Sequence, residues 1–578
     1  MRPLTLRYIV GAGAGLVLVG WQLYLAGRQY WLWALLCGLL LLAGAGVQWR
    51  HRRGGSAGLV HRWAARSRRH DGVASVWTIL RVSSSWAARR KAAILRPSLA
   101  ELSWWARWRV PIRELATPLA RVGWLRVWSP IEDVTLRLGG PRTGKTGELC
   151  GRILDAPGSV VATSTRTDLI DHTRALRSRR GPVYVFNPSG VGGRASTITF
   201  SPLSGCEDPA TATARATDLI AGTSLTVHSG GVGDREYWEG HARRTLAVLL
   251  HAAALGDLTM WEVLAWLASE DAAAPIVMGY LSRSPEPAFE HDAELFFHTS
   301  DRTRSSISAT ITPALGWLSD RTAAASANKG GFDVEALLAD RGTVYLLGAE
   351  DAQVAPLVTA LTGHIARQAR RLAGRQPSGR LDPPLTLALD EAALICPIRL
   401  DLWTADMGGR GVTIHIAAQS RAQLRQRWGP DGAAAILNNA ATVLIFGGGR
   451  DPDDLAAYST LTGDRHERVV TRDSGGAVTS VSAHRVPVLS PAQIAQLPAG
   501  HAVVIRRGMP PAIGRPRMAW TRHDVRAARG PRAAVWSLRW AMVATWGRSW
   551  LAQPTPAVKG RPGLRVVPPP PESTTDAA

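Results

Sequence analysis

The first 50 residues contain two long stretches without a charged residue. They cover residues 8–26 and 30–48, 19 residues each, and the only charge between them is Arg28. A helix of about 20 apolar residues crosses a hydrocarbon core ~30 Å thick, so the pattern predicts a transmembrane helical hairpin over residues 1–53. Arginines flank its outer ends, which predicts a multi-pass protein of the cell (inner or plasma) membrane with both termini in the cytoplasm. A cleaved signal peptide is the alternative, and the immediate second stretch disfavours it.

Three apolar runs farther along the chain have the character of buried strands. They are residues 134–138, 385–391 and 411–420. Residues 207–339 differ, because their apolar positions recur three and four residues apart, the spacing of helices. The pattern therefore predicts an α/β protein with an inserted all-α domain, preceded by the two-helix hairpin.

The chain of 578 residues carries 68 Lys and Arg against 45 Asp and Glu, a formal charge of +23. The excess lies at the ends, since residues 1–130 hold 20 basic and 3 acidic residues whereas residues 131–521 hold 39 of each. A small nucleic-acid-binding module would itself be basic, and the neutral centre disfavours that class. The four cysteines are scattered, without the spacing of a zinc site or a disulfide framework.

The basic ends are also rich in tryptophan. Of the 23 tryptophans, 12 precede residue 130 and four follow residue 530. We predict that residues 54–130 form a basic juxtamembrane linker that contacts anionic lipid. Base stacking on a nucleic-acid strand is the alternative for this linker. Residues 522–578 are predicted to form a basic Trp-bearing helix, membrane-bound or packed, and a disordered Pro-rich tail.

The motif with the most specific chemistry follows the first predicted strand. It has the pattern of a phosphate-binding loop and consists of Gly139, Gly140, Pro141, Arg142, Thr143, Gly144, Lys145 and Thr146. Its glycines allow backbone N–H groups to surround a phosphate at the N-terminus of the next helix. Lys145 is expected to reach the β- and γ-phosphates of ATP, and the Thr146 hydroxyl to ligate Mg²⁺.

A second acidic site is expected at the end of the strand that reads Leu-Thr-Leu-Ala-Leu. There Asp390 is predicted to hold Mg²⁺, and Glu391 to act as the general base that polarises the attacking water. An ordinary strand that ends in surface acids is the alternative for this pattern taken alone. The upstream phosphate loop favours the catalytic interpretation.

The third predicted strand contributes two further candidates. Gln419, at its end, suits a sensor of the γ-phosphate, and Arg410, just before it, could act as an arginine finger toward a neighbouring subunit. A salt bridge within a loop is the alternative for Arg410. His415 lies inside the apolar run, so we expect it in the core.

Together these motifs resemble those of the coupling ATPases of type IV secretion and bacterial conjugation, over most of residues 115–520. The resemblance rests on stretches in a fixed order: the phosphate loop, Val185-Phe186-Asn187-Pro188, Thr199-Phe200-Ser201-Pro202-Leu203, Asp390-Glu391, Gly409-Arg410-Gly411 and Ala418-Gln419-Ser420. It implies a RecA-like P-loop NTPase domain formed by residues 131–206 and 340–521, with the all-α insert between them. It also implies a homohexamer that passes single-stranded DNA with its relaxase, or other secreted proteins, to the proteins of a secretion channel.

The resemblance is not complete. Asn187 occupies a position where the family often has Asp, and the turn of the hairpin is shorter than the family's extracytoplasmic loop. One alternative is a septal-type translocase of double-stranded DNA, which residues 522–578 disfavour because they are too short for a winged-helix reader. A membrane scaffold that binds nucleotide without hydrolysis is another, and the pair Asp390 and Glu391 argues against it.

Overall fold

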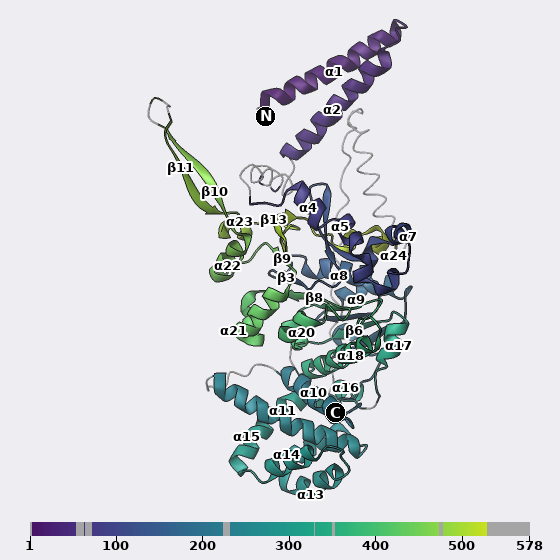
Figure 1. The fold of residues 1–578 in the computed structure, drawn as a ribbon, viewed down its shortest axis with the longest axis vertical. Coiled ribbons are helices and arrows are strands. Elements are labelled where there is room, and N and C mark those ends of the chain that lie inside the picture. Colours follow the sequence, from purple (N-terminus) through teal and green to yellow (C-terminus); the bar gives the residue numbers. More distant parts are fainter. Residues whose placement is uncertain are drawn as a thin grey trace, which may run out of the picture. The chain divides into compact units, whose positions relative to one another are not determined.

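The three strands predicted from apolar runs belong to the parallel part of a nine-stranded mixed sheet (Figure 1). Its order is β13-β12-β9-β3-β8-β7-β4-β6-β5. The seven parallel strands are β3 (Thr135–Leu138), β4 (Val160–Ser164), β5 (Val183–Phe186), β6 (Thr343–Leu347), β7 (Leu385–Leu389), β8 (Val412–Ala418) and β9 (Thr442–Phe446). The antiparallel strands β12 (Ala502–Arg506) and β13 (Met509–Gly514) extend one edge. The fold is therefore α/β and RecA-like, as predicted.

The computed structural model describes residues 3–53, 60, 63, 72–223, 232–328, 330–349, 353–472, 475 and 478–528. The predicted Trp-bearing helix and Pro-rich tail lie outside the described residues, except for α24 (His523–Ala528). Residues up to Val525 form one unit, and those from Arg526 onward form a second.

Alternate residues of the sheet strands belong to two hydrophobic cores, one on each face. Leu387 and Ile416 belong to the first core, which contains α18, whereas Ala388 and Ala417 belong to the second, which contains α8 and α9. The helices and turns of this domain are α8 (Lys145–Asp155), α9 (Asp168–Arg177), η4 (Val191–Gly193), α18 (Ala355–Arg375), α19 (Ala392–Ile395), α20 (Leu400–Asp406), α21 (Arg421–Asn439), α22 (Pro452–Thr462), α23 (Pro491–Ala495) and η6 (Ala519–Thr521). Burial on both faces explains why the parallel strands read as continuous apolar runs.

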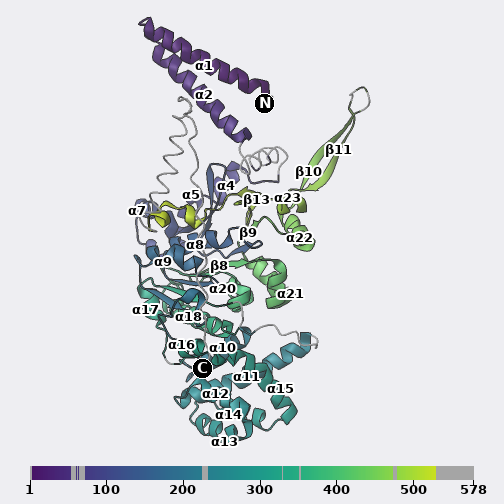
Figure 2. The ribbon, with the colours of Figure 1, turned by 180° about the vertical axis from the view of Figure 1, so that it is seen from behind.

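Between β5 and β6 the described residues contain helices and no regular strand (Figure 2). The long helix α11 contacts α13, α14 and α15. The elements are α10 (Pro209–Ala221), α11 (Val232–Leu255), α12 (Met260–Ala268), α13 (Glu270–Leu281), α14 (Pro287–Phe297), α15 (Asp301–Ile311), η5 (Thr312–Ser319), α16 (Arg321–Ser326) and α17 (Val334–Ala339).

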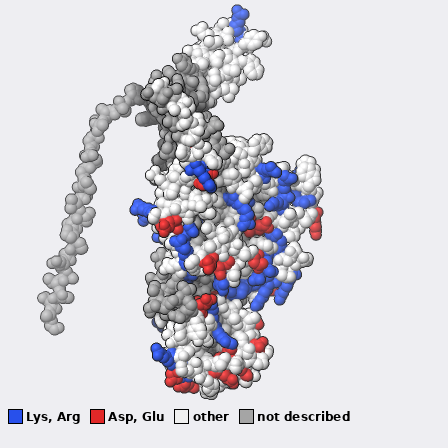
Figure 3. All heavy atoms as spheres, turned by 60° about the vertical axis from the view of Figure 1, so that its left-hand side comes forward, with Lys and Arg blue, Asp and Glu red and all other residues white. Residues whose placement is uncertain are grey.

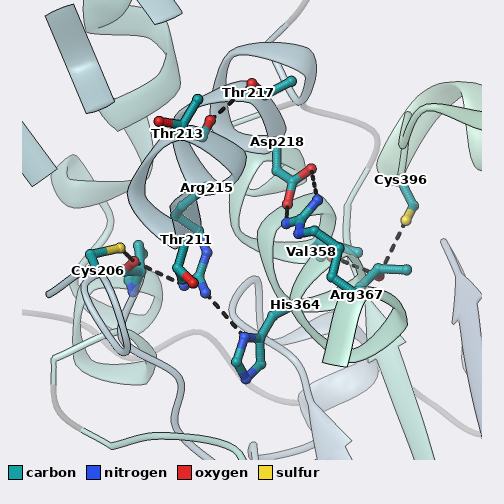
Figure 4. A network of polar contacts seen from close by, with 12 residues as sticks. Cys206, Thr211, Thr213, Arg215, Thr217, Asp218, Val358, His364, Arg367 and Cys396 are labelled. Atoms are coloured by element: carbon teal, nitrogen blue, oxygen red, sulfur yellow. Dashed lines mark hydrogen bonds and ion pairs between the residues drawn. The ribbon is translucent and has the colours of Figure 1, made fainter. Parts of the chain in front are cut away.

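The first helix of this insert, α10, is fixed to α18 by buried polar contacts (Figure 4). Arg367 on α18 donates to the buried carboxylate of Asp218, with Nη1 3.1 Å from Oδ1. Arg215 lies over the ring of Phe200 and donates to Nδ1 of His364 at 3.2 Å. Because buried charges are costly unless paired, these contacts fix the position of α10 on the nucleotide-binding domain.

The described part of the predicted linker is folded. Its elements are α4 (Val76–Val82), α5 (Ser85–Arg90), α6 (Ala92–Leu95), η2 (Pro97–Leu99), α7 (Trp104–Arg109), η3 (Ile112–Glu114), β1 (Ala116–Val122) and β2 (Leu125–Pro130). Strands β1 and β2 form a hairpin, and Ile79, Leu119 and Val127 share a core with β12 and β13. Arg96 pairs with both Glu114 and Asp382.

A second hairpin, β10 (Asp464–Arg472) with β11 (Val478–Pro487), was not anticipated from the sequence. Its alternation of polar and apolar residues is irregular, and the side chains described on β11 are almost all exposed. Because the described side chains of β11 have no buried face, this strand gives no periodic apolar signal.

The N-terminal residues form two antiparallel helices, α1 (Pro3–Leu25) and α2 (Trp31–Arg53). They approach closely at glycines, since a Cβ at Gly20 or Gly38 would lie within 2.9 Å of backbone atoms of the other helix. Among the described residues, no helix combines the length and the apolar character needed to cross a membrane.

Candidate nucleotide-binding site

The phosphate loop joins the end of β3 to the start of α8. Gly144 precedes α8 with φ +105°, and Arg142 within the loop has φ +60°. Both values lie in the left-handed region, which costs a side-chain-bearing residue such as Arg142 free energy and is typical of functional loops. The loop thereby presents the N-terminus of α8, where N–H groups have no helical partner, to an anion.

Lys145 is held at the centre of this loop. Its Nζ donates to the carbonyl oxygens of Gly139 and Gly140, the latter at 3.0 Å. Burial lowers the pKa of Lys145, and the nearby carboxylates of Glu391 and Asp390 oppose that shift. An ammonium group held by two carbonyl oxygens can exchange them for phosphate oxygens of greater charge.

Asp390 lies directly beside Thr146. The Thr146 hydroxyl donates to Oδ2 of Asp390 at 2.7 Å, whereas the buried Oδ1 has no hydrogen-bond partner among the described residues. Burial and the neighbouring Glu391 raise the pKa of Asp390 to about 6, against the hydrogen bond from Thr146 and the charge of Lys145. Mg²⁺ at a nucleotide is usually held by only one or two protein ligands, together with phosphate oxygens and water. The Thr146 hydroxyl and the unpaired carboxylate oxygen of Asp390 fit that requirement.

Glu391 and Gln419 face one another across this site. The Nε2 atom of Gln419 lies 3.4 Å from Oε2 of Glu391. Gln419 directly follows β8, which lies between β3 and β7. The ends of three neighbouring parallel strands therefore bring the phosphate loop, Gln419 and the acidic pair to one edge. Glu391 has φ +50°, a strained conformation for a residue with a side chain.

Arg410 lies at the other edge of the sheet, before the first residue of β8. Its Nε donates to Asp406 at 2.7 Å, and both side chains are partly exposed. The structure therefore contains the loop salt bridge considered above. Within one subunit Arg410 does not join the other site residues, and its role as a finger toward a neighbour stays a prediction.

A buried ionic group fixes α8 beneath the loop. Arg137 on β3 pairs with Glu148, and Nε of Arg152 lies 3.2 Å from the same carboxylate; the side chains of Arg137 and Glu148 are fully buried. His415 is buried nearby, and its pKa is lowered well below the ordinary value by burial and by Arg137. His415 is thus a neutral core residue, as predicted.

Two segments of the site were missed from the sequence. Gly447, Gly448 and Gly449 follow β9, and a Cβ at Gly448 would touch Thr143 in the phosphate loop. The segment after β13 also covers α8, where Met518 contacts Gly144 and the ring of Trp520 lies against Gly147. Three glycines directly after an apolar strand were an available signal, whereas Met518 and Trp520 carried none.

The geometry is that of a RecA-like P-loop protein. We also compared the chain with protein-family models, curated proteins and solved structures. Residues 384–499 match a family model described as the TraM recognition site of TraD and TraG. No curated protein matches this sequence. The match contains Asp390, Glu391, Arg410 and Gln419.

Solved structures of the plasmid coupling protein TrwB share the fold. Its unbound monoclinic form, TrwBdeltaN70, aligns with a TM-score of 0.54 at 20% identity, over 69% of this chain and 88% of that one. TrwB with ADP and Mg²⁺ gives 0.52 at 20% identity, over 70% and 89%. TrwB with the GTP analogue GDPNP gives 0.52 at 18%, over 75% and 92%. The family model thus covers residues 384–499 of this chain, and the TrwB structures share its fold.

Proposed function

We propose that this chain is a membrane-anchored, ATP-driven motor that couples substrates to a type IV secretion or conjugation channel. The substrates are DNA, as a relaxase-bound single strand, or secreted proteins. The observation that carries the proposal is the meeting of Thr146, Asp390, Glu391 and Gln419 at one edge of the sheet. A protein that only binds nucleotide has no need of a general base there.

The chemistry follows from these positions. ATP with Mg²⁺ supplies the phosphoanhydride bond that is cleaved. Lys145 would hold its phosphate oxygens, and Thr146 with Asp390 would hold the metal ion. Glu391 accepts a proton from the attacking water, and Gln419, in contact with Glu391, orients the same water.

The partners follow from the family. The TraM-recognition model over residues 384–499 supports contact with a DNA-processing complex. A homohexamer would bring Arg410 of one subunit to the nucleotide of the next, which requires the pair Arg410–Asp406 to open. On the face drawn in Figure 3, basic and acidic residues are interspersed, so a DNA path depends on local placement of arginines.

Membrane anchoring by α1 and α2 is part of the proposal. Large apolar side chains on both helices are exposed, among them Leu18 (65%), Trp33 (70%) and Leu40 (71%). Close approach at small residues is how helices pack in lipid. Resistance of the full chain to alkaline extraction from membranes, lost on deletion of residues 1–53, would support the anchor, and unchanged extraction would contradict it.

ATP turnover by the full chain, measured with and without DNA, tests the motor. We expect single-stranded DNA to stimulate turnover severalfold and more than double-stranded DNA does, with Lys145→Ala inactive in each case. Stronger stimulation by double-stranded DNA would favour the septal-type translocase. Nucleotide binding without any turnover would favour the scaffold.

A further inference from the structure

A cavity of about 700 Å³ lies beside α8, away from the phosphate loop. It is bounded by β1, β2, the C-terminal half of α8, and the residues that follow β13. Its lining includes seven arginines but a single acidic residue, Asp155. None of residues 139–146, Asp390, Glu391 or Gln419 lines it, so it is distinct from the nucleotide site.

The arginines of this cavity differ in whether their charge is compensated. Arg152 and Arg522 pair with Glu148 and Asp155. In contrast, the side chains of four others have no hydrogen bond or ion pair with the described part of the chain: Arg113, Arg126, Arg515 and Arg517. All four are exposed residues at the lining of the cavity, where solvated guanidinium groups can bind an anion, and their planar fork matches phosphate.

His501 is a buried part of the cavity wall, with 5% of the residue exposed. Its ring hydrogen-bonds to the backbone of Ala499 and Pro498, and its Nδ1 is shielded from solvent. His501 therefore shapes the wall and offers no free polar atom to a ligand. Leu119, Ile513 and Met518 supply apolar wall beside it.

We propose that this cavity binds a small molecule that carries a phosphate group and an apolar portion. The arginines without a partner bind the phosphate, and the apolar wall covers the remainder. The volume is in the range of small-molecule sites. The phosphate can belong to a phospholipid headgroup or to a soluble nucleoside monophosphate, and both sources share the recognised chemistry.

Calorimetric titration of the full chain in neutral detergent tests the proposal, in a Lys145→Ala background so that the phosphate loop is disabled. The probes are short-chain phosphatidylglycerol, AMP and, as a control without net charge, short-chain phosphatidylcholine. We expect phosphatidylglycerol or AMP to bind at least tenfold more tightly than phosphatidylcholine. Binding of the first alone identifies a lipid source, and binding of AMP alone a soluble one.

Substitutions locate the binding. Arg515→Ala with Arg517→Ala should weaken it at least tenfold. The matched control is Arg179→Ala with Arg302→Ala, which removes the same charge from exposed positions outside the cavity and should change nothing. Equal effects of the two double variants would overturn the proposal, as would binding of a dT oligonucleotide in place of both phosphate probes.

Discussion

The Thr146 hydroxyl donates a hydrogen bond of 2.7 Å to Asp390, although 244 positions separate the two residues. The contact joins the phosphate loop after β3 to the end of β7, two strands away in the sheet. It holds a hydroxyl and a carboxylate together where Mg²⁺ and the terminal phosphates of a nucleotide are proposed to bind.

Replacing Thr146 by Val removes that hydroxyl and keeps the shape of the side chain. We expect the affinity for Mg²⁺-nucleotide to fall at least tenfold, because one metal ligand is lost, while affinity for metal-free nucleotide changes little. Thr146→Ser, which keeps the oxygen, should retain the Mg²⁺ effect. Titration of fluorescent ADP with and without Mg²⁺ measures both, and an undiminished Mg²⁺ effect in the Val variant would contradict the assignment.

Gly147 and Gly151 form a matched pair one turn apart on α8. A Cβ at Gly147 would lie 2.2 Å from the ring of Trp520, whereas at Gly151 the nearest atom is 3.8 Å away. Ala gains about 1 kcal/mol over Gly in a helix, but overpacking costs about 1–3 kcal/mol. Thermal unfolding should therefore show Gly151→Ala unchanged or stabilised and Gly147→Ala destabilised. Adding Trp520→Ala to Gly147→Ala should restore the melting temperature. A double variant as unstable as Gly147→Ala would contradict the proposed clash with the Trp520 ring.

Arg427 on α21 caps the C-terminus of α10. Its guanidinium donates to the carbonyl oxygens of Thr223, at 2.6 Å, and Ala221. A cation at a helix C-terminus satisfies carbonyl groups that have no helical partner. Arg427→Ala should lower the local stability of α10 by about 1 kcal/mol, seen as faster hydrogen exchange in residues 216–223. Arg425→Ala is the control, and equal exchange in both variants would argue against the cap.

His364 makes the packing of α10 against α18 sensitive to pH. Burial and the charge of Arg215 lower its pKa to about 4. The unfolded chain protonates His364 below about pH 6.5, whereas the folded chain does so only near pH 4. The free energy of unfolding therefore falls as the pH drops through this window, by about 3 kcal/mol in total.

His364→Gln keeps a hydrogen-bond acceptor without titrating. The variant should therefore lose less stability than the wild type between pH 7 and pH 4.5, measured by urea unfolding. Asp390, whose pKa is raised to about 6, titrates in both proteins, so their difference isolates His364. His291→Gln, at an exposed position, is the control, and parallel pH profiles for His364→Gln and wild type would refute the effect.

The central strands were predictable because both faces of the sheet are buried. Residues 385–389 and 412–418 are entirely buried, which requires the continuous apolar runs that a sequence reading detects. The phosphate loop was predictable because its chemistry demands glycines, a lysine and a hydroxyl at fixed spacing. Gln419 was predicted as a polar residue at the end of a strand, whereas the strand order that brings it beside Glu391 was not predicted.

Other parts of the molecule could not be predicted from the sequence, because they depend on tertiary packing. Met518 and Trp520 reach α8 only because β12 and β13 extend the sheet and return the chain. The described basic residues between Gly72 and β3 lie on short helices and a hairpin, or in the turns between them, and the apolar positions of these elements are too few for a clear period. The net charge of a segment likewise does not show that Arg113 and Arg126 lie at the same cavity as Arg515 and Arg517, which follow nearly 400 residues later.

The catalytic role of Glu391 is the centre of this account, and Glu391→Gln tests it most directly because the change removes the base while preserving size. ATP binding and ATP turnover should be measured on the same preparation of the full chain. We predict ATP affinity within about threefold of wild type and turnover reduced about 100-fold or more. Turnover at the wild-type rate, with ATP bound normally, would contradict the proposal that ATP hydrolysis at this site depends on Glu391 and drives translocation.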